Sequence, residues 1–303
     1  MHALAPYFIR CYNPDTEIKN VEERYDFLNK VGQYDTFDLL LDFIDAHKQF
    51  EKVDDKKQTY KFLNVQINKK KRTVSGWMCL GEYGIRNDII DTDDNKVAFE
   101  KHTKHADVKN YFFIFSIPRE SRKGIALLHT YKSDGVKSMF YGEFSNFFRD
   151  KTKKNLQIQP LTYEKAMEPW LEAEMKEIKV VGFKPTKNIE DKIHGLGDVE
   201  HEYKIKAKRN KTLGKFKDFL VKDSDESKLI EVLNHGSKQV KALVSMGGSH
   251  KTFTVGHGDK HAFCQIDVDE EEVTIVDGNP DFTSINKWAS DILKEISRAI
   301  NIG

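Results

Sequence analysis

The segment Tyr111–Pro118, YFFIFSIP, is almost wholly apolar and ends at a proline. A short apolar run that a turn residue ends predicts a strand buried on both faces. Gly124–Tyr131 (GIALLHTY) predicts a second strand, and Ser133–Gly135 supplies turn residues after it. Aromatic residues at helical spacing predict a helix over Val136–Phe148, and Asn155–Leu161 predicts a third strand. The segment therefore predicts a core of strands and helices in the α+β class.

The connections between these elements are basic. We expect them to supply phosphate contacts from Arg119, Arg122, Lys123, Lys151, Lys153 and Lys154.

The first hundred residues predict two helices and a hairpin. Apolar residues at helical spacing place the helices over Val21–Val31 and Thr36–Phe50. Gln58–Ile67 and Thr73–Gly84 predict antiparallel strands joined by a basic turn, and Asp88–Asn95 is acidic and irregular.

Beyond Leu161, strands and helices alternate. The pattern predicts strands over Lys176–Lys184, His201–Lys208 and Gln239–Met246, with helices over Ile189–Leu196 and within Thr212–Asn234. Alternating elements of this length indicate a second, smaller α/β domain.

We therefore expect a mixed-sheet α/β core domain formed by residues 1–172 plus 262–303, with a basic α/β domain inserted over 173–261. Gly247–Gly258 reads as a flexible stretch, and Ala262–Val268 with Val273–Asp277 as a hairpin. An apolar stripe from Ile285 to Ile300 predicts a terminal helix that packs on the core domain or on a second copy of it.

The charge of the chain is unevenly distributed, although the net charge of its 303 residues is only +1. Residues 203–222 hold eight Lys or Arg and one acid, whereas residues 264–291 hold eight acids and one Lys. Such asymmetry indicates a surface directed at a polyanion.

The cysteines and the hydropathy predict a cytoplasmic protein. Cys11, Cys79 and Cys264 are odd in number and widely spaced, which argues against a disulfide framework. No apolar run approaches the roughly 20 residues that span a bilayer, and no signal-peptide core is present, so we expect no direct membrane insertion.

The basic segment carries the main functional prediction. In a strand, Lys204, Lys206 and Lys208 share one face at a spacing of about 6.6 Å, close to that of successive phosphates. Arg209, Lys211 and Lys215 extend this row. The pattern predicts phosphate contact without base reading; the alternative is a solvated sheet face.

Two other constellations could carry chemistry. His250, His257, His261 and Cys264 could hold zinc with Asp259, or could simply belong to a polar glycine loop. Glu202-Tyr203-Lys204 has the ExK form of nuclease strands that hold Mg²⁺, with Asp191 upstream as a second ligand. No P-loop, GxSxG or HExxH pattern occurs, and no residue pattern points to an organic cofactor.

Residues 108–300 resemble the RexA family of phage-exclusion proteins and related phage-defence proteins. The string Gln157–Leu161, QIQPL, is close to the QIEPL of that family. It follows an aromatic strand (Phe112–Ile117), a glycine-bearing strand (Gly124–Tyr131) and a helix, as in the family, and a Val/Lys-rich strand (Ile178–Lys184) comes next.

The resemblance implies a homodimer that binds double-stranded DNA with little sequence preference. It also implies a role in abortive phage defence beside a membrane-protein partner, and it carries over no catalytic residue. We thus expect a non-enzymatic DNA-binding protein; the alternative is a Mg²⁺-dependent nuclease that uses the ExK residues.

Overall fold

The computed structural model describes residues 2–13, 21–132, 134–161, 168–182, 202–246, 249–255 and 265–302. The chain divides into two compact units. Unit 1 comprises residues 1–6 and 160–301, and unit 2 comprises residues 7–159 and 302–303. Fourteen of the described strands connect through hydrogen bonds into an antiparallel sheet, to which both units contribute.

Unit 2 is built on long antiparallel hairpins. Strands β4 (Gln58–Asn68) and β5 (Thr73–Glu82) pair through a basic turn, and β5 pairs with β8 (Asp107–Ser116). β8 then pairs with β9 (Gly124–Tyr131). Shorter strands complete this unit: β2 (Tyr25–Asp26), β3 (Glu51–Val53), β10 (Asp134–Gly135) and β11 (Asn155–Pro160). β1 (His2–Tyr12) begins in unit 1 and continues into unit 2.

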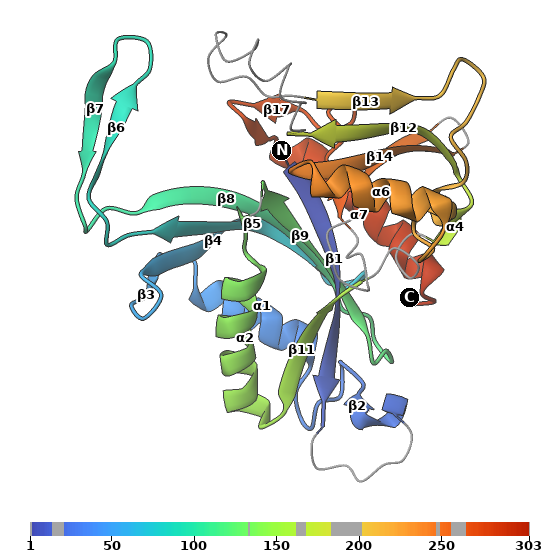
Figure 1. Ribbon diagram of the computed structural model, residues 1–303. Helices are drawn as coiled ribbons and strands as arrows, with labels where there is room; N and C mark the ends of the chain where they lie inside the picture. The colour runs from blue at the N-terminus through green and yellow to red at the C-terminus, as the bar shows by residue number, and fades with distance from the viewer. Residues whose placement is uncertain are drawn as a thin grey trace. The chain divides into compact units, whose positions relative to one another are not determined.

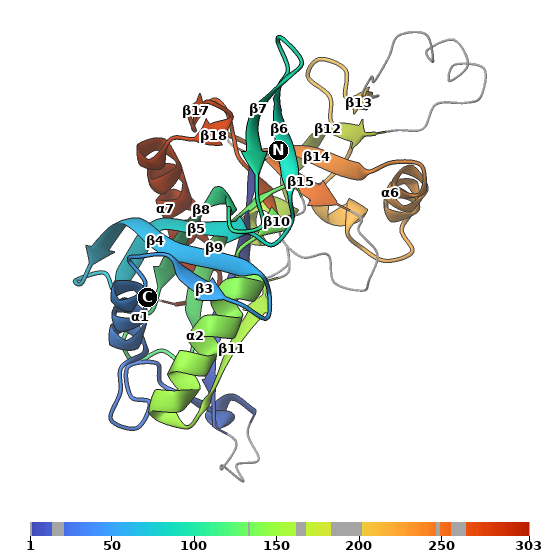
Figure 2. The ribbon, with the colours of Figure 1, turned by 90° about the vertical axis from the view of Figure 1, so that its left-hand side faces the viewer.

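Two helices, α1 (Thr36–Ala46) and α2 (Lys137–Thr152), lie beside each other against this sheet (Figures 1 and 2). Aromatic rings fill the space between helices and strands. Phe43 of α1 lies 5.2 Å from Phe144 of α2, and Phe140 lies 4.8 Å from Phe115 of β8, measured between ring centroids. Large buried rings contribute most of the hydrophobic stabilisation of such a core.

A separate two-stranded hairpin projects from the ends of β5 and β8 (Figure 1). Its strands are β6 (Asn87–Asp91) and β7 (Lys96–Lys101), and the large apolar residues that they carry are about half exposed. These residues are Ile89, Ile90, Val97 and Phe99.

The sheet of unit 1 follows the order β13-β12-β14-β15-β16 and then the first residues of β1. Its strands are β12 (Glu174–Val181), β13 (Glu202–Lys206), β14 (Gln239–Met246), β15 (Ser249–Val255) and β16 (Ile266–Asp267). Unit 1 also contains α4 (Glu168–Leu171), η3 (Phe216–Phe219, a 3₁₀ turn), α6 (Asp225–His235), β17 (Ile275–Val276), β18 (Asn279–Pro280) and α7 (Phe282–Ala299). A second 3₁₀ turn, η1 (Val21–Arg24), belongs to unit 2.

One face of this sheet is apolar and packs on helices. Phe253 of β15 stacks on Phe216 of η3 with ring centroids 4.9 Å apart, and its ring also meets Trp170 of α4. α6 covers β14 on the same face and buries Ile230 and Leu233 (Figure 2).

Asp281 caps the N-terminus of the terminal helix α7, and its side chain accepts a hydrogen bond from the backbone N–H of Ser284. That bond lowers the pKa of Asp281. The apolar stripe of α7 is buried, as predicted, at Ile285, Trp288, Ala289, Ile292, Leu293 and Ile296. Glu295 accepts bonds from Lys251 of β15 and Trp170, so α7 completes unit 1, which also contains the basic strand.

Several predicted elements agree with the structure. The strand over Gly124–Tyr131, the strand over Gln239–Met246 and the hairpin of β4 and β5 are confirmed. The helices at Thr36 and Val136 are confirmed with shifted ends.

Other predictions are wrong. The predicted helix over Val21–Val31 is only the 3₁₀ turn η1, because the N–H of Leu28 bonds to Ser121 and Val31 pairs with Tyr34. The irregular acidic stretch is the β6–β7 hairpin. β16 pairs with β1 and β15 rather than forming a hairpin with β17, and Ser249–Val255 is a strand instead of a flexible stretch.

The fold is α+β, but no mixed sheet or inserted domain is seen in the described residues. The strand pairings that define these ladders are antiparallel. Short turns join β4 to β5 and β14 to β15, whereas a parallel pair requires a long crossover. The chain passes from one compact unit to the other at 6/7, 159/160 and 301/302. The expected domain bounds at 172/173 and 261/262 stay a prediction. The predicted helix over Ile189–Leu196 lies outside the described residues.

We predict that Ile292→Asp destabilises the protein by about 4 kcal/mol, because it places a carboxylate where the side chain is 1 % exposed. Lys287→Asp, on the exposed face of the same helix, is the control. Thermal and urea unfolding of both variants measure the effect. An unchanged melting temperature for Ile292→Asp would contradict this packing of α7.

Candidate nucleic-acid interface

The second face of the unit 1 sheet is polar. Lys204 and Lys206 of β13 project from this face, and Tyr203 and Ile205 project from the other, as period-two alternation requires. Lys204 forms an ion pair with Glu177 of β12 at 3.2 Å. The carboxylate of Glu177 therefore offsets the charge of Lys204, the first lysine of the predicted row.

The chain turns directly after β13. The N–H of Lys211 donates to the carbonyl of Lys208 at 2.9 Å, and Asn210 adopts a left-handed conformation with φ of 58°. The N–H of Ala207 donates to the carbonyl of Lys176, which fixes the start of the turn on β12. These bonds give the basic turn a defined backbone.

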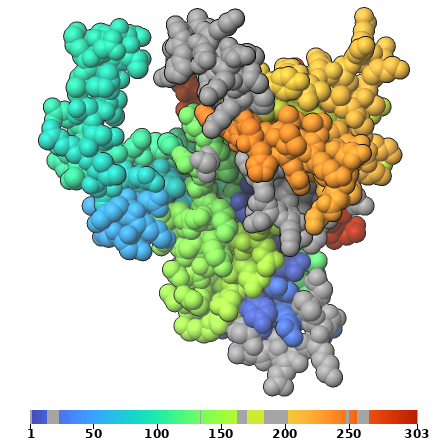
Figure 3. Space-filling view, in the orientation of Figure 1, coloured from blue at the N-terminus to red at the C-terminus, as the bar shows by residue number. Residues whose placement is uncertain are grey.

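This basic turn and the adjoining strand ends enclose a cavity of about 420 Å³. The cavity is lined by Lys176, Lys206, Ala207, Lys208, Arg209, Asn210, Lys211, Leu243 and His250. Its lining contains five Lys or Arg and one His but no acid. We call it the basic cavity. In Figure 3 the turn forms part of the outer edge of unit 1.

Lys176 of the cavity lining pairs with Glu174, whereas the cations of the basic turn have no carboxylate partner among the described residues. In the described part of the chain, no ion pair involves Lys206, Lys208, Arg209 or Lys211, and all four side chains are exposed. Exposed cations that share no acid create a positive potential that attracts anions.

Lys176 was not predicted as a site residue, and His250 was predicted only as a possible zinc ligand. Lys176 lies at an irregularity of β12, where the register to β14 shifts between Met175 and Glu177. A bulge re-aims a side chain, and the Lys176 ammonium also donates to the carbonyl of Lys211 at 3.3 Å. His250 reaches the site because it lies opposite Ser245 in the β14–β15 pair. No pattern in the sequence predicts the irregularity at Lys176 or the pairing of His250 with Ser245.

Lys215, predicted as a DNA contact, lies outside the basic cavity. Its ammonium and that of Lys217 contact the two oxygens of Glu172 at 2.7 and 2.5 Å. Hydrogen bonds from Lys215 and Lys217 hold the pKa of Glu172 at about 2. The carboxylate therefore neutralises part of this charge across the physiological pH range.

The predicted contacts at residues 119–123 and 151–154 belong to unit 2, so the structure does not bring them together with the basic cavity in one unit. Several of them have structural partners. Arg122 donates to the carbonyl of Tyr25 and lies over the ring of Phe27 at 4.3 Å. Lys154 forms an ion pair with Asp26.

The remaining predicted contacts of unit 2 lie at the same two connections. Lys151 lies over the ring of Phe147 at 5.9 Å, and Lys153 donates to the carbonyl of Asp150 at the end of α2. Arg119 is exposed, and Lys123 is half-buried.

A buried ion pair lies in the polar face of unit 1. Lys241 of β14 and Asp267 of β16 are paired, with side chains 4 % and 7 % exposed. Thr254 lies 3.5 Å from the other carboxylate oxygen, and Gln239 donates to Thr254 at 2.8 Å. Burial raises the pKa of Asp267, and the Lys241 ammonium opposes that rise. Removal of one partner of such a buried pair is costly, whereas replacement of both by apolar residues is often neutral.

The two metal hypotheses gain no support from the described residues, which contain no group of three or more His, Cys, Asp or Glu able to hold an ion. Glu202 forms an ion pair with Lys179 at 2.7 Å, and Lys204 with Glu177, so both residues of the ExK motif have partners on β12. Asp191, His257, Asp259, His261 and Cys264 lie outside the described residues.

Comparison of the chain with protein-family models and with curated proteins found no match. The interpretation of the site therefore depends on its own geometry.

Among the described residues, no helix combines the length and apolar character needed to cross a membrane.

We predict that Asp267→Ala destabilises the protein by about 3–5 kcal/mol, because it leaves the buried Lys241 ammonium without its carboxylate. The double variant Lys241→Met/Asp267→Leu removes both charges and should regain most of that loss. Urea unfolding of the two variants tests this coupling. Equal losses in the single and double variants would contradict it.

Proposed function

We propose that the protein binds the phosphate backbone of double-stranded DNA through the basic cavity, with little sequence preference. One observation carries the proposal: Lys206, Lys208, Arg209 and Lys211 surround a cavity without an acid in its lining. The other predicted lysines in this segment, Lys204 and Lys215, are paired with acids.

The chemistry of the basic turn favours backbone contact over base reading. From a turn, the ammonium group of lysine and the guanidinium group of arginine can contact phosphates without entering a groove of the DNA. No long recognition helix carries these residues, which lie on a strand end and a turn. Affinity for DNA should therefore come from charge and counterion release.

A role in phage defence beside a membrane-protein partner is part of this proposal and is supported by the sequence resemblance alone. The second candidate function is the Mg²⁺-dependent nuclease. Glu202 and Lys204 lie on the same sheet face as Glu177 and Lys179, a second ExK triplet on β12. Incubation with plasmid and Mg²⁺ separates the two functions: retarded intact DNA supports binding, and cleavage lost in Glu202→Gln supports the nuclease.

We predict that Lys206→Glu/Lys208→Glu abolishes DNA binding in a gel shift while the melting temperature stays unchanged. With five or six phosphates neutralised, log K of the wild type should fall with log salt at a slope of about −5. A single Arg209→Ala change should make the slope shallower by about 1.

The matched control is Lys222→Glu/Lys228→Glu, which makes the same charge change at exposed positions of unit 1 outside the basic cavity. It should retain most of the affinity. Equal losses in the two double variants would show that only net charge matters, and a flat salt response would exclude backbone contact.

We also propose that the protein is a symmetric dimer and that the β6–β7 hairpin of a second copy covers that of the first. Ile89 lies opposite Phe99 and Ile90 opposite Val97, so these exposed residues form two adjacent apolar pairs. An isolated two-stranded hairpin is marginally stable, and an exposed apolar hairpin with free edges favours self-pairing. Two-fold assembly is the commonest arrangement for identical chains.

We predict a particle of twice the 35.1 kDa chain mass by light scattering at micromolar concentration. Ile89→Asp/Phe99→Asp should halve the mass. Asp88→Lys/Glu100→Lys, which changes a polar cross-strand pair of the same hairpin, serves as the control. A 35.1 kDa wild-type particle would contradict the dimer.

A further inference from the structure

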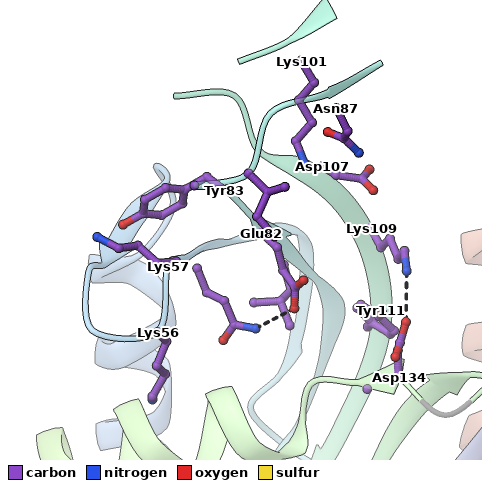
Figure 4. Close-up of a pocket in the computed structure, with 15 residues that line it drawn as sticks. Lys56, Lys57, Glu82, Tyr83, Asn87, Lys101, Asp107, Lys109, Tyr111 and Asp134 are labelled. Carbon is purple, nitrogen blue, oxygen red and sulfur yellow. Dashed lines mark hydrogen bonds and ion pairs between the residues drawn. The ribbon is translucent and has the colours of Figure 1, made fainter. Parts of the chain in front are cut away.

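A cavity of about 760 Å³ lies in unit 2 at the base of the β6–β7 hairpin (Figure 4). Its walls come from the turn before β4, the ends of β4 and β5, the end of β7, the start of β8, and β10. The volume falls within the roughly 300–1,000 Å³ of sites for small molecules. All of the lining residues belong to unit 2.

Lys101, the last residue of β7, is 9 % exposed and lines this cavity. In Figure 4 its side chain leaves the hairpin and reaches down toward Asp107. It forms no hydrogen bond or ion pair with any described residue, whereas Lys56 pairs with Glu143 and Lys109 with Asp134, both at 3.0 Å. Burial of an ammonium group without a carboxylate costs several kcal/mol unless another anion compensates.

Tyr111 of β8 is a second buried donor in the same cavity. It is 3 % exposed, and its hydroxyl bonds to no described residue. Burial raises the pKa of Tyr111, so the phenol stays protonated and can donate. Asp107, Lys109 and Tyr111 project from the same face of β8, because side chains alternate along a strand. Tyr111 therefore lies about 13 Å from Asp107 along β8. Asp107, toward which Lys101 reaches, and Tyr111 therefore lie at opposite ends of the part of β8 that lines the cavity.

The remaining lining combines apolar surface with three carboxylates, Glu82, Asp107 and Asp134. Glu82 accepts a hydrogen bond from Gln58, and Asp134 pairs with Lys109. Tyr83, Leu80 and Ile85 present aromatic and aliphatic surface, and Ile85 is 72 % exposed at the rim. Lys57 lies beside Tyr83, with its ammonium 5.9 Å from the ring centroid, and forms no ion pair with a described residue. In Figure 4 the Lys57 ammonium points away from Lys101, so Lys101 is the cation that faces the proposed phosphate group.

We propose that this cavity is a binding site for a nucleotide-sized organic phosphate, with the phosphate group at Lys101. Tyr111 donates to an acceptor at the opposite end of the ligand, and Tyr83 and Ile85 contact its apolar part. The site is independent of the basic cavity, which lies in unit 1.

Calorimetric titration of the full chain with AMP, GMP, CMP, UMP and ribose 5-phosphate tests the site, with the corresponding nucleosides as probes that lack phosphate. We expect at least one phosphate ester to bind and its dephosphorylated form to bind at least tenfold more weakly. Lys101→Met should lower the affinity for the ester about tenfold or more, and Tyr111→Phe about fivefold.

Two controls separate this site from the basic cavity. Lys206→Glu/Lys208→Glu should bind the ester as the wild type does. Lys101→Met should keep its DNA binding and should melt no lower than the wild type, because it removes a buried charge. Failure of all five esters to bind at millimolar concentration, or unchanged affinity in Lys101→Met, would overturn the proposal. Loss of ester binding in Lys206→Glu/Lys208→Glu would also overturn it.

Discussion

The alternation of side chains across the antiparallel sheet of unit 1 is the constraint on which its basic cavity depends. Ile178 pairs with Ile205 across β12 and β13, and Phe253 continues the apolar face onto η3 and α4. The opposite face carries Lys206 beside Glu177 and the buried pair of Lys241 and Asp267. A slip of one residue would move the lysines into the core, so the packing of the apolar face fixes which cations face solvent.

Antiparallel hairpins also organise unit 2, where they form the walls of the second cavity. β5 and β8 keep register from Thr73 opposite Ser116 to Glu82 opposite Asp107. The rings of Phe43, Phe140 and Phe144 hold the helices on one side of these strands. Where β5 and β8 extend past α2, a cavity lined by Tyr83 and Tyr111 remains, and Lys101 at the end of β7 also lines it (Figure 4). The second cavity thus follows from strands that are longer than the helices covering them.

The sequence predicted the elements in which local pattern and tertiary environment agree. Gly124–Tyr131 is an apolar run bounded by turn residues, and it is a strand with the predicted ends. The helical spacing of Val21–Val31 was misleading, because Leu28 and Val31 are buried by contacts to the β8–β9 turn and a local bridge. Ser249–Val255 was missed because flanking glycines suggested flexibility, while its pairing with β14 is a contact that no local pattern reveals.

The same distinction applies to the sites. Charge density along the sequence located the basic turn, but it also selected Lys215 and Lys154, which are paired with acids from other segments. Lys101 lies in a segment of mixed charge and was not selected, although it is a buried lysine that forms no ion pair with a described residue. Whether a lysine or arginine can bind an anion therefore depends on whether the fold places a carboxylate beside it. Exposed unpaired cations on a turn suit an extended polyanion that stays in solvent, whereas a buried unpaired cation suits a small anion that enters the protein.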